Sequence, residues 1–200
     1  MQMRQSLTPF FEPSSVAVIG GSKNPNKLSN GIVKNLLAYG YGGSVVTVNP
    51  KEKEILGSKC YASILDVKGP VDLAVIILPV KYIAGVITDC GKKGVKAVIV
   101  ISGGFKEVGA DGAVLEKEIV AICKKYNMRM IGPNCVGTMN LKTGLNTTFI
   151  RGIPAAGGIG FISQSGAVCG GVVDHVIHLG IGFSHFLSLG NEANVSETDM

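Results

Sequence analysis

Short apolar runs recur along the chain, each closed by glycine, proline or serine, and they predict the strands of a buried sheet. The first run, residues 16–19, is an unbroken series of small and β-branched side chains. Such a series is typical of a central parallel strand that is covered on both faces. Further strands are expected at residues 44–48, 72–78, 96–101 and 129–131.

The segments between these runs have apolar residues at the spacing of a helix. After the first strand, Ser29 or Asn30 can cap a helix and Gly40 can end it. Two more helices are expected at residues 82–90 and 112–126. Alternation of strand and helix specifies a parallel sheet with right-handed crossovers, so we expect an α/β protein. The apolar face of the first helix should contain Ile32, Val33, Leu36 and Leu37.

A second α/β unit is expected after the polar, turn-rich residues 141–151. The pattern there predicts a strand, a turn and a helix, then another strand, and residues 196–199 are typical of a helix cap and first turn. An α/β domain should not stop at that point. We therefore expect residues 1–150 to form one domain and residues 151–200 to be the incomplete start of a second. The elements predicted in this second unit cover residues 158–163, 164–167, 168–179 and 183–189.

Composition limits the possible partners. Hydrophobic residues make up 46% of the 200 residues and charged residues 16%, a balance that excludes disorder. The formal charge of +5 is modest and the lysines are scattered, which favours a small anionic ligand over nucleic acid. No apolar run has the length of a membrane span or the form of a signal sequence. We expect a soluble, cytoplasmic protein that does not bind a membrane.

The cysteines show neither a C-x-x-C pair nor metal-ligand spacing. This usage predicts free thiols in a reducing cytoplasm and no metal site. The five cysteines are Cys60, Cys90, Cys123, Cys135 and Cys169.

The loop GGSKNPNK at residues 20–27 is the first candidate for chemistry. Its paired glycines permit a turn that other residues resist, and a helix start beyond it suits an anion. It is not the dinucleotide fingerprint G-x-G-x-x-G, because Ser22 and Pro25 occupy positions that require glycine. The alternative is an ordinary solvated connection between strand and helix. Side chains that can bind a phosphate chain are Ser22, Lys23, Asn24 and Lys27.

The end of the second predicted strand gives a further indication. Dinucleotide-binding proteins usually place an acidic residue there for the ribose hydroxyls, whereas this chain has Asn49, Pro50 and Lys51, with Lys53 beyond. A phosphorylated ribose would explain the lysines, and NADP and coenzyme A both carry one. A solvated helix start explains either lysine equally well when each is taken alone.

Six motifs in order then identify a resemblance to the NDP-forming acyl-CoA synthetase family, which includes ADP-forming acetyl-CoA synthetase and succinyl-CoA synthetase. They are VAVIGGSKNP, VVTVNPK, VDLAVIILPV, AVIVISGGF, MIGPNCVG and FISQSGA. The resemblance implies a Rossmann-like CoA-binding domain, followed by the start of a flavodoxin-like domain. It also implies a ligase that makes acetyl-CoA from acetate, ATP and coenzyme A, through an acyl phosphate and a phosphohistidine.

The same resemblance assigns the site residues. Asn134 and Cys135 would lie near the thiol and the acyl group, while Ser165, Gly166 and Ala167 would hold the phosphate of the phosphohistidine. Cys135 could instead be a nucleophile, although a buried thiol is the commoner case. The residues implied for coenzyme A are Gly20, Ser22, Lys23, Asn24 and Pro25 at the pyrophosphate, Asn49, Pro50 and Lys51 at the phosphorylated adenosine, and Val80, Ile101, Ser102 and Gly103 along the adenine and pantetheine.

The resemblance further implies partners outside this chain. Phosphate and acyl-CoA would be the small molecules, and an ATP-grasp β-subunit or fused domain would bring ADP or ATP with magnesium. None of His175, His178 and His185 matches the phosphorylated histidine of the family, so the chain alone should be inactive and the full enzyme an oligomer. Two alternatives stay open: a CoA-binding regulatory module, such as the domain attached to protein acetyltransferases, and an NADP-dependent reductase. Asn194 also stands where relatives usually carry Asp.

Overall fold

A computed structural model describes residues 6–200 and places β1 (Ser15–Ile19) near the centre of a seven-stranded sheet. The strand order is β3-β4-β2-β1-β5-β6-β7, and all pairings are parallel except that of β3 with β4. The chain therefore places β2, β3 and β4 on one side of β1, then returns past β1 and places β5, β6 and β7 on the other side. The remaining strands are β2 (Ser44–Val48), β3 (Glu54–Ile55), β4 (Ser58–Tyr61), β5 (Leu73–Ile76), β6 (Ala97–Val100) and β7 (Arg129–Ile131).

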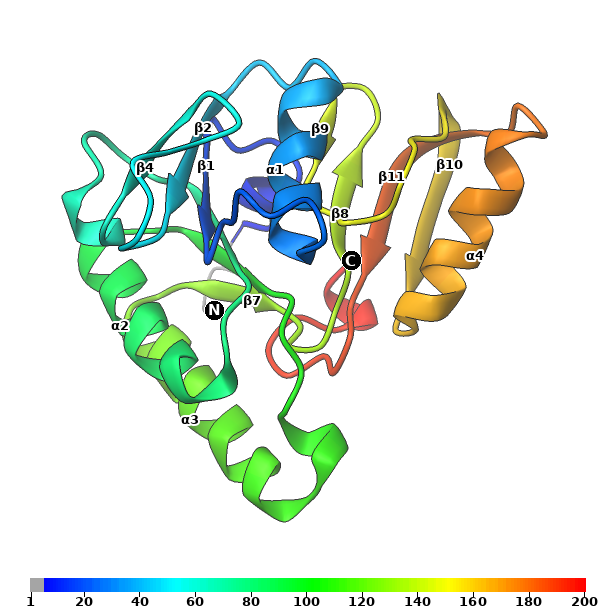
Figure 1. The fold of residues 1–200 in the computed structure, drawn as a ribbon. Coiled ribbons are helices and arrows are strands. Elements are labelled where there is room, and N and C mark those ends of the chain that lie inside the picture. The colour runs from blue at the N-terminus through cyan, green and yellow to red at the C-terminus, as the bar shows by residue number, and fades with distance from the viewer. Residues whose placement is uncertain (1–5) are drawn as a thin grey trace.

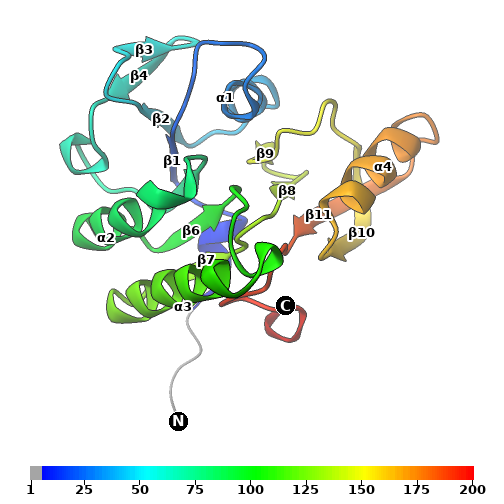
Figure 2. The ribbon, with the colours of Figure 1, turned by 60° about the horizontal axis from the view of Figure 1, so that its bottom comes forward.

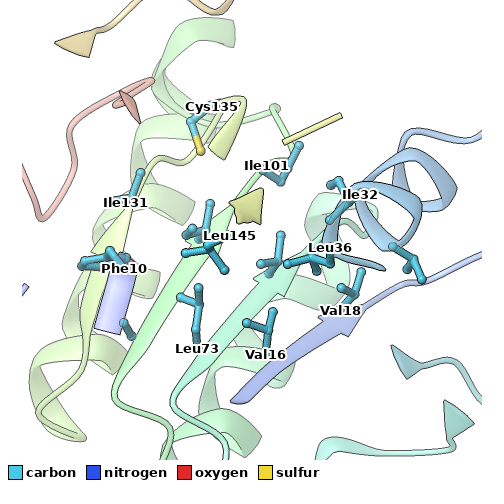
Figure 3. Packing of buried hydrophobic residues seen from close by; sticks show 14 of the residues in the cluster. Phe10, Val16, Val18, Ile32, Leu36, Leu73, Ile101, Ile131, Cys135 and Leu145 are labelled. Atoms are coloured by element: carbon cyan, nitrogen blue, oxygen red, sulfur yellow. The ribbon is translucent and has the colours of Figure 1, made fainter. Parts of the chain in front are cut away.

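Helices cover both faces of this sheet (Figure 2), with α1 (Leu28–Ala38) on one side and α2 (Ile83–Lys93) and α3 (Ala110–Lys125) on the other. Side chains of β1 alternate between the two layers because successive residues of a strand point to opposite faces. Val16 and Val18 belong to the cluster with α1 (Figure 3), and Ala17 and Ile19 pack with α2 and α3. The predicted central strand, buried on both faces, is confirmed.

A second, four-stranded sheet lies beside the first (Figure 1), in the order β10-β11-β8-β9. Its parallel pair, β10 (Ala155–Ser163) and β11 (Gly182–Ser188), is joined by α4 (Gly166–Ile177). β8 (Gly137–Asn140) and β9 (Leu145–Asn146) add to it in antiparallel fashion. These two strands come from residues that precede the expected domain boundary, and the division of the chain at residue 150 stays a prediction. Short helical turns are η1 (Thr8–Phe10), η2 (Ile64–Asp66), η3 (Val80–Tyr82), η4 (Lys106–Val108) and η5 (Glu197–Asp199).

The start of α1 corrects one expectation. Neither Ser29 nor Asn30 caps the helix, because the N-cap position is Lys27 and both residues are buried in the first turn. Asn30 uses its side chain for a tertiary contact instead, donating from Nδ2 to the carbonyl oxygen of Ser22 at 2.9 Å. Leu37 is also misassigned, since it is 46% exposed while the other three apolar residues of its predicted face are buried.

The edge of the seven-stranded sheet is covered by chain that follows the second sheet. Ala193 and Val195 donate backbone N–H groups to the carbonyl oxygens of Gly132 and Met130, each at 3.1 Å. Between them, Asn194 Oδ1 accepts from the backbone N–H of Met130 at 2.9 Å. The side chain of Asn194 thus replaces a strand partner, and this segment fastens one sheet to the other.

The turn after β1 gives a test of the fold. Gly20 has a φ of +92°, and an added Cβ would lie 2.0 Å from the carbonyl oxygen of Ile77. Gly40 has a φ of +79° with no atom near its Cβ position, so it controls for backbone strain alone. We expect Gly40→Ala to lower the free energy of unfolding by about 1–2 kcal/mol. Gly20→Ala should lower it by about 1–3 kcal/mol more, because β1 and β5 must separate. Equal losses in urea unfolding would contradict this close approach.

Candidate functional site

The carboxyl ends of the parallel strands open into two adjoining cavities. The first, of about 900 Å³, lies among the loops that follow β1, β2, β4 and β5. The second, of about 1120 Å³, lies between the loops that follow β6 and β7 and the start of α4. Leu28, Ile77 and Ser102 line both cavities. A ligand longer than either cavity can therefore extend from one into the other.

The first cavity has the position and the polarity of an anion site. It lies where the chain changes direction across the sheet, between the ends of β1, β2 and β5, which is where ligands bind in open α/β sheets. Leu28 and Ser29 line it from the first turn of α1. The first N–H groups of a helix have no intrahelical acceptor and form its positive end. Backbone donors and a partial positive charge thus face the cavity.

Asn49 joins the two loops at the floor of the first cavity. Its Nδ2 donates to the carbonyl oxygen of Gly21 at 2.7 Å, and its Oδ1 accepts from the N–H of Lys51 at 2.9 Å. Both ends of the carboxamide are therefore used within the protein. These contacts set the loop geometry, and one amide hydrogen of Asn49 remains for a ligand, so the predicted ligand contact of Asn49 stays a prediction.

Lys23 lies outside the lining of both cavities. Its Nζ is 2.8 Å from Glu52 Oε2, so the pair links the loop after β1 to the loop after β2. The hydrogen bond and the charge of Glu52 raise the pKa of Lys23 above its usual value. Lys23 is thus a protonated side chain in solvent, near but not inside the first cavity.

The second cavity contains the start of α4. Ser165 is the N-cap residue, and its Oγ accepts from the N–H of Val168 at 3.3 Å. The amides of Gly166 and Ala167, the first two residues of the helix, are left for an external acceptor. The helix thus begins at Gly166, two residues earlier than the predicted start at residue 168, and its free amides can bind an anion.

Asn134 lines the same cavity in a left-handed backbone conformation, with a φ of +58°. Its Nδ2 donates to Asn191 Oδ1 at 3.4 Å. A left-handed residue other than glycine is uncommon, and asparagine is among the residues that tolerate it best. The left-handed conformation at position 134 is therefore one that asparagine, the residue predicted for the site, adopts readily.

Cys135 is buried beside Asn134, and its Sγ donates to the carbonyl oxygen of Val100 at 3.3 Å. Burial raises the pKa of this thiol to about 12. Since the thiolate is the nucleophilic form, a thiol with such a pKa is not activated at neutral pH. The structure favours a packing role for Cys135 over the nucleophile hypothesis.

Most, but not all, of the predicted site residues come together. Asn24, Pro25 and Val80, like Lys23, do not line either cavity. The sequence also missed lining residues, among them Ser63, Phe149 and Asn191, because they follow short strands or loops without a motif. The predicted residues that line the first cavity are Gly20, Ser22, Lys27, Asn49, Pro50, Lys51 and Ser102, and those that line the second are Ile101, Ser102, Gly103, Asn134, Cys135, Ser165, Gly166 and Ala167.

The histidines lie away from both cavities. His175 and His178 are exposed on and just after α4, and His185 packs edge-on against Phe11 at 5.2 Å between ring centroids. Across residues 6–200 no group of three His, Cys, Asp or Glu side chains is placed to hold a metal ion. No helix within that range is long and apolar enough to cross a membrane.

Two family models match successive parts of the chain. Residues 14–140 match the family model of the CoA binding domain, and residues 156–200 match that of the succinyl-CoA ligase like flavodoxin domain. The alpha subunit of acetate–CoA ligase (ADP-forming) II from Pyrococcus furiosus is 48% identical, over 97% of this chain and 42% of its own length. The acetate–CoA ligase (ADP-forming) of Methanocaldococcus jannaschii is 47% identical, over 94% of this chain and 26% of its own.

A solved structure is similar over nearly the whole chain. The dinucleotide forming acetyl-coenzyme A synthetase 1 of Ca. Korarchaeum cryptofilum, in complex with phosphate and ADP, superposes with a TM-score of 0.94 at 42% identity. The match covers 98% of this chain and 42% of that one, so the chain spans less than half the length of these relatives. The mixed α/β fold, the two joined cavities and these matches lead to one conclusion: the chain belongs to the CoA-binding domain family, in the form carried by ADP-forming acyl-CoA ligases.

Proposed function

We propose that this chain is the CoA-binding portion of an ADP-forming acyl-CoA ligase, which interconverts acetate, ATP and coenzyme A with acetyl-CoA, ADP and phosphate. The observation that carries the proposal is that the two cavities adjoin, since Leu28, Ile77 and Ser102 line both. Coenzyme A is a long molecule with a charged nucleotide at one end and a thiol at the other. A polar cavity joined to a second cavity with an anion-binding helix start suits both of its ends and a phosphate group.

In the first cavity, the proposal assigns the diphosphate to the start of α1 and the phosphorylated adenosine to the loop after β2. Leu28 and Ser29 supply backbone N–H groups, and Lys51 supplies a charge that a ribose phosphate can pair with. Asn49 keeps both loops at a fixed separation through its bonds to Gly21 and Lys51. Its second amide hydrogen can still donate to the nucleotide, so Asn49 both positions the loops and is a proposed contact of coenzyme A.

In the second cavity, the proposal assigns a phosphate group to Ser165, Gly166 and Ala167. The helix start binds it through backbone donors and the positive dipole end, while Asn134 lies toward the acyl group. Donors that are already in place stabilise developing charge without reorganisation. The chain's own contribution is therefore binding and orientation of thioester and phosphate.

Several elements of the proposal lie outside this chain. The phosphorylated histidine, and an ATP-grasp subunit or domain that binds ADP or ATP with magnesium, would be supplied by the remainder of the enzyme. Residence in the cytoplasm and an oligomeric state belong to the same proposal. A regulatory CoA-binding module is the alternative, and the anion site in the second cavity favours the ligase over it because a module that only binds coenzyme A needs no second phosphate site.

The lysine after β2 gives the first test of the assignment. In the full-length ligase, Lys51→Ala should weaken coenzyme A binding about tenfold, as expected for loss of one charged hydrogen bond. Dephospho-coenzyme A lacks the ribose phosphate, so its affinity should be unchanged in the variant. Isothermal titration with both ligands measures the difference, and Lys117→Ala on α3 is the control for loss of one positive charge. Equal weakening of the two ligands would remove Lys51 from the phosphate site.

The start of α4 gives the second test. Ser165→Ala in the full-length ligase should slow phosphoryl transfer about 10- to 1000-fold, as for loss of one preorganised donor. Coenzyme A affinity should stay within twofold, and Ser184→Ala on β11 is the matched control. Gly166→Val is less specific, since a Cβ at Gly166 would already lie 2.7 Å from Val136 Cγ2. Lost coenzyme A affinity with intact phosphoryl transfer would make this helix start a coenzyme A contact instead.

A further inference from the structure

Asn191, which follows β11 and lines the second cavity, has a partner for every polar group it carries. Its backbone N–H donates to the carbonyl oxygen of Pro133 at 2.9 Å, and its carbonyl oxygen accepts from Lys106 Nζ. Its Nδ2 donates to Glu107 Oε2 at 2.7 Å and to Glu116 Oε2 at 2.8 Å. No motif had pointed to this residue.

The two carboxylates fix which way the carboxamide of Asn191 points. An ionised carboxylate only accepts hydrogen bonds, so the amide nitrogen must face Glu107 and Glu116. Burial alone would raise the pKa of Glu107, but hydrogen bonds from Asn191 and from the amides of Gly104 and Phe105 bring that pKa below its usual value. Glu107 is therefore ionised at neutral pH, and Asn191 Oδ1 is directed away from it.

That orientation determines the orientation of Asn134. Asn191 Oδ1 accepts from Asn134 Nδ2 at 3.4 Å, which leaves Asn134 Oδ1 facing Gly103. A Cβ at Gly103 would lie 3.2 Å from Asn134 Oδ1 and 2.9 Å from Glu107 Oε1, so this glycine packs between the two side chains. The loops after β6, β7 and β11 thus meet at one carboxamide.

The neutral amide group of Asn191 also lies between two carboxylates, those of Glu107 and Glu116. Glu107 and Glu116 both accept from the same nitrogen. Among the ion pairs within residues 6–200, the one that brings positive charge to this position is that of Lys106, whose Nζ is 3.6 Å from Glu116 Oε1. Glu116 is 7% exposed, which strengthens any repulsion. Replacing the donor with a third acceptor would drive these loops apart.

We propose that Asn191 is a positioning residue of the ligase reaction: it holds Asn134 and the loop after β6 in place and joins them to the chain that follows β11. The inference rests on the proposed function and adds to it a residue that acts through Asn134. Because Asn191 lies away from the first cavity, its loss should affect turnover more than coenzyme A binding.

The test exchanges donor and acceptor in the full-length ligase. Asn191→Asp places a third carboxylate beside Glu107 and Glu116, and we expect kcat to fall about 10- to 100-fold with coenzyme A affinity within twofold. The triple variant N191D/E107Q/E116Q reverses both pairs, because the amide nitrogens of the new side chains at 107 and 116 can donate to the new carboxylate. The oxygen of the new side chain at 107 can still accept from the amides of Gly104 and Phe105, as Glu107 Oε1 does. Recovery of at least about tenfold in kcat over N191D supports the inference, since loss of packing alone would not be reversed by E107Q and E116Q.

The other outcomes are also decisive. Full activity in N191D, or equal loss in N191D and the triple variant with both folded, would overturn the positioning role. If N191D fails to fold, Asn191→Ala removes the donors without adding charge, and the same fall in kcat with retained coenzyme A affinity supports the role while unchanged kcat overturns it. A wild-type ligase that neither binds coenzyme A nor forms acetyl-CoA would refute the proposed function itself, which separates the two failures.

Discussion

Parallel pairing of β1 with both β2 and β5 is the constraint on which the site depends. It brings the ends of all three strands to one edge, and hydrogen bonding continues past them, from Gly20 N–H to Val48 O and from Ile77 N–H to Ile19 O, each at 2.9 Å. The backbone of Gly20 then passes so close to Ile77 that a side chain does not fit. The loops that follow β1, β2 and β5 separate just beyond this close contact of Gly20 with Ile77, and the first cavity lies between them.

The second cavity depends on how the two sheets are joined. Residues 193–195 run along the edge of β7, and Asn35 of α1 donates to the carbonyl oxygens of Thr148 and Ile150 at 2.7 and 2.9 Å. Thr138 of β8 donates to the carbonyl oxygen of Phe10 at 3.0 Å. Polar side chains thus bind backbone groups across the junction, which fixes geometry more specifically than apolar packing alone. The start of α4, where we propose the anion site, follows a strand of the sheet that these contacts hold against the first.

The sequence predicted the elements whose signal is local, and it failed where tertiary contacts decide. Residues 16–19, 44–48 and 129–131 were recognisable as strands because their apolar runs are short and closed by turn residues. The hairpin of β3 and β4 was missed, since two- and four-residue strands with lysine and glutamate carry no periodicity. The cap at Ser29 or Asn30 was wrong because Asn30 satisfies the carbonyl of Ser22 instead. Glu107, Glu116 and Asn191 could not be connected from sequence, because 84 and 75 positions separate the bonded pairs.

The central claim is that one ligand occupies both cavities in a continuous path along the carboxyl edge of the sheet. A crystal structure of the full-length ligase with coenzyme A and phosphate tests it most directly. The account predicts the diphosphate at the start of α1, the pantetheine passing Ile77 and Ser102, and the thiol in the second cavity near Asn134, with phosphate at Ser165. Coenzyme A bound elsewhere, or with its thiol directed out of the second cavity, would contradict it.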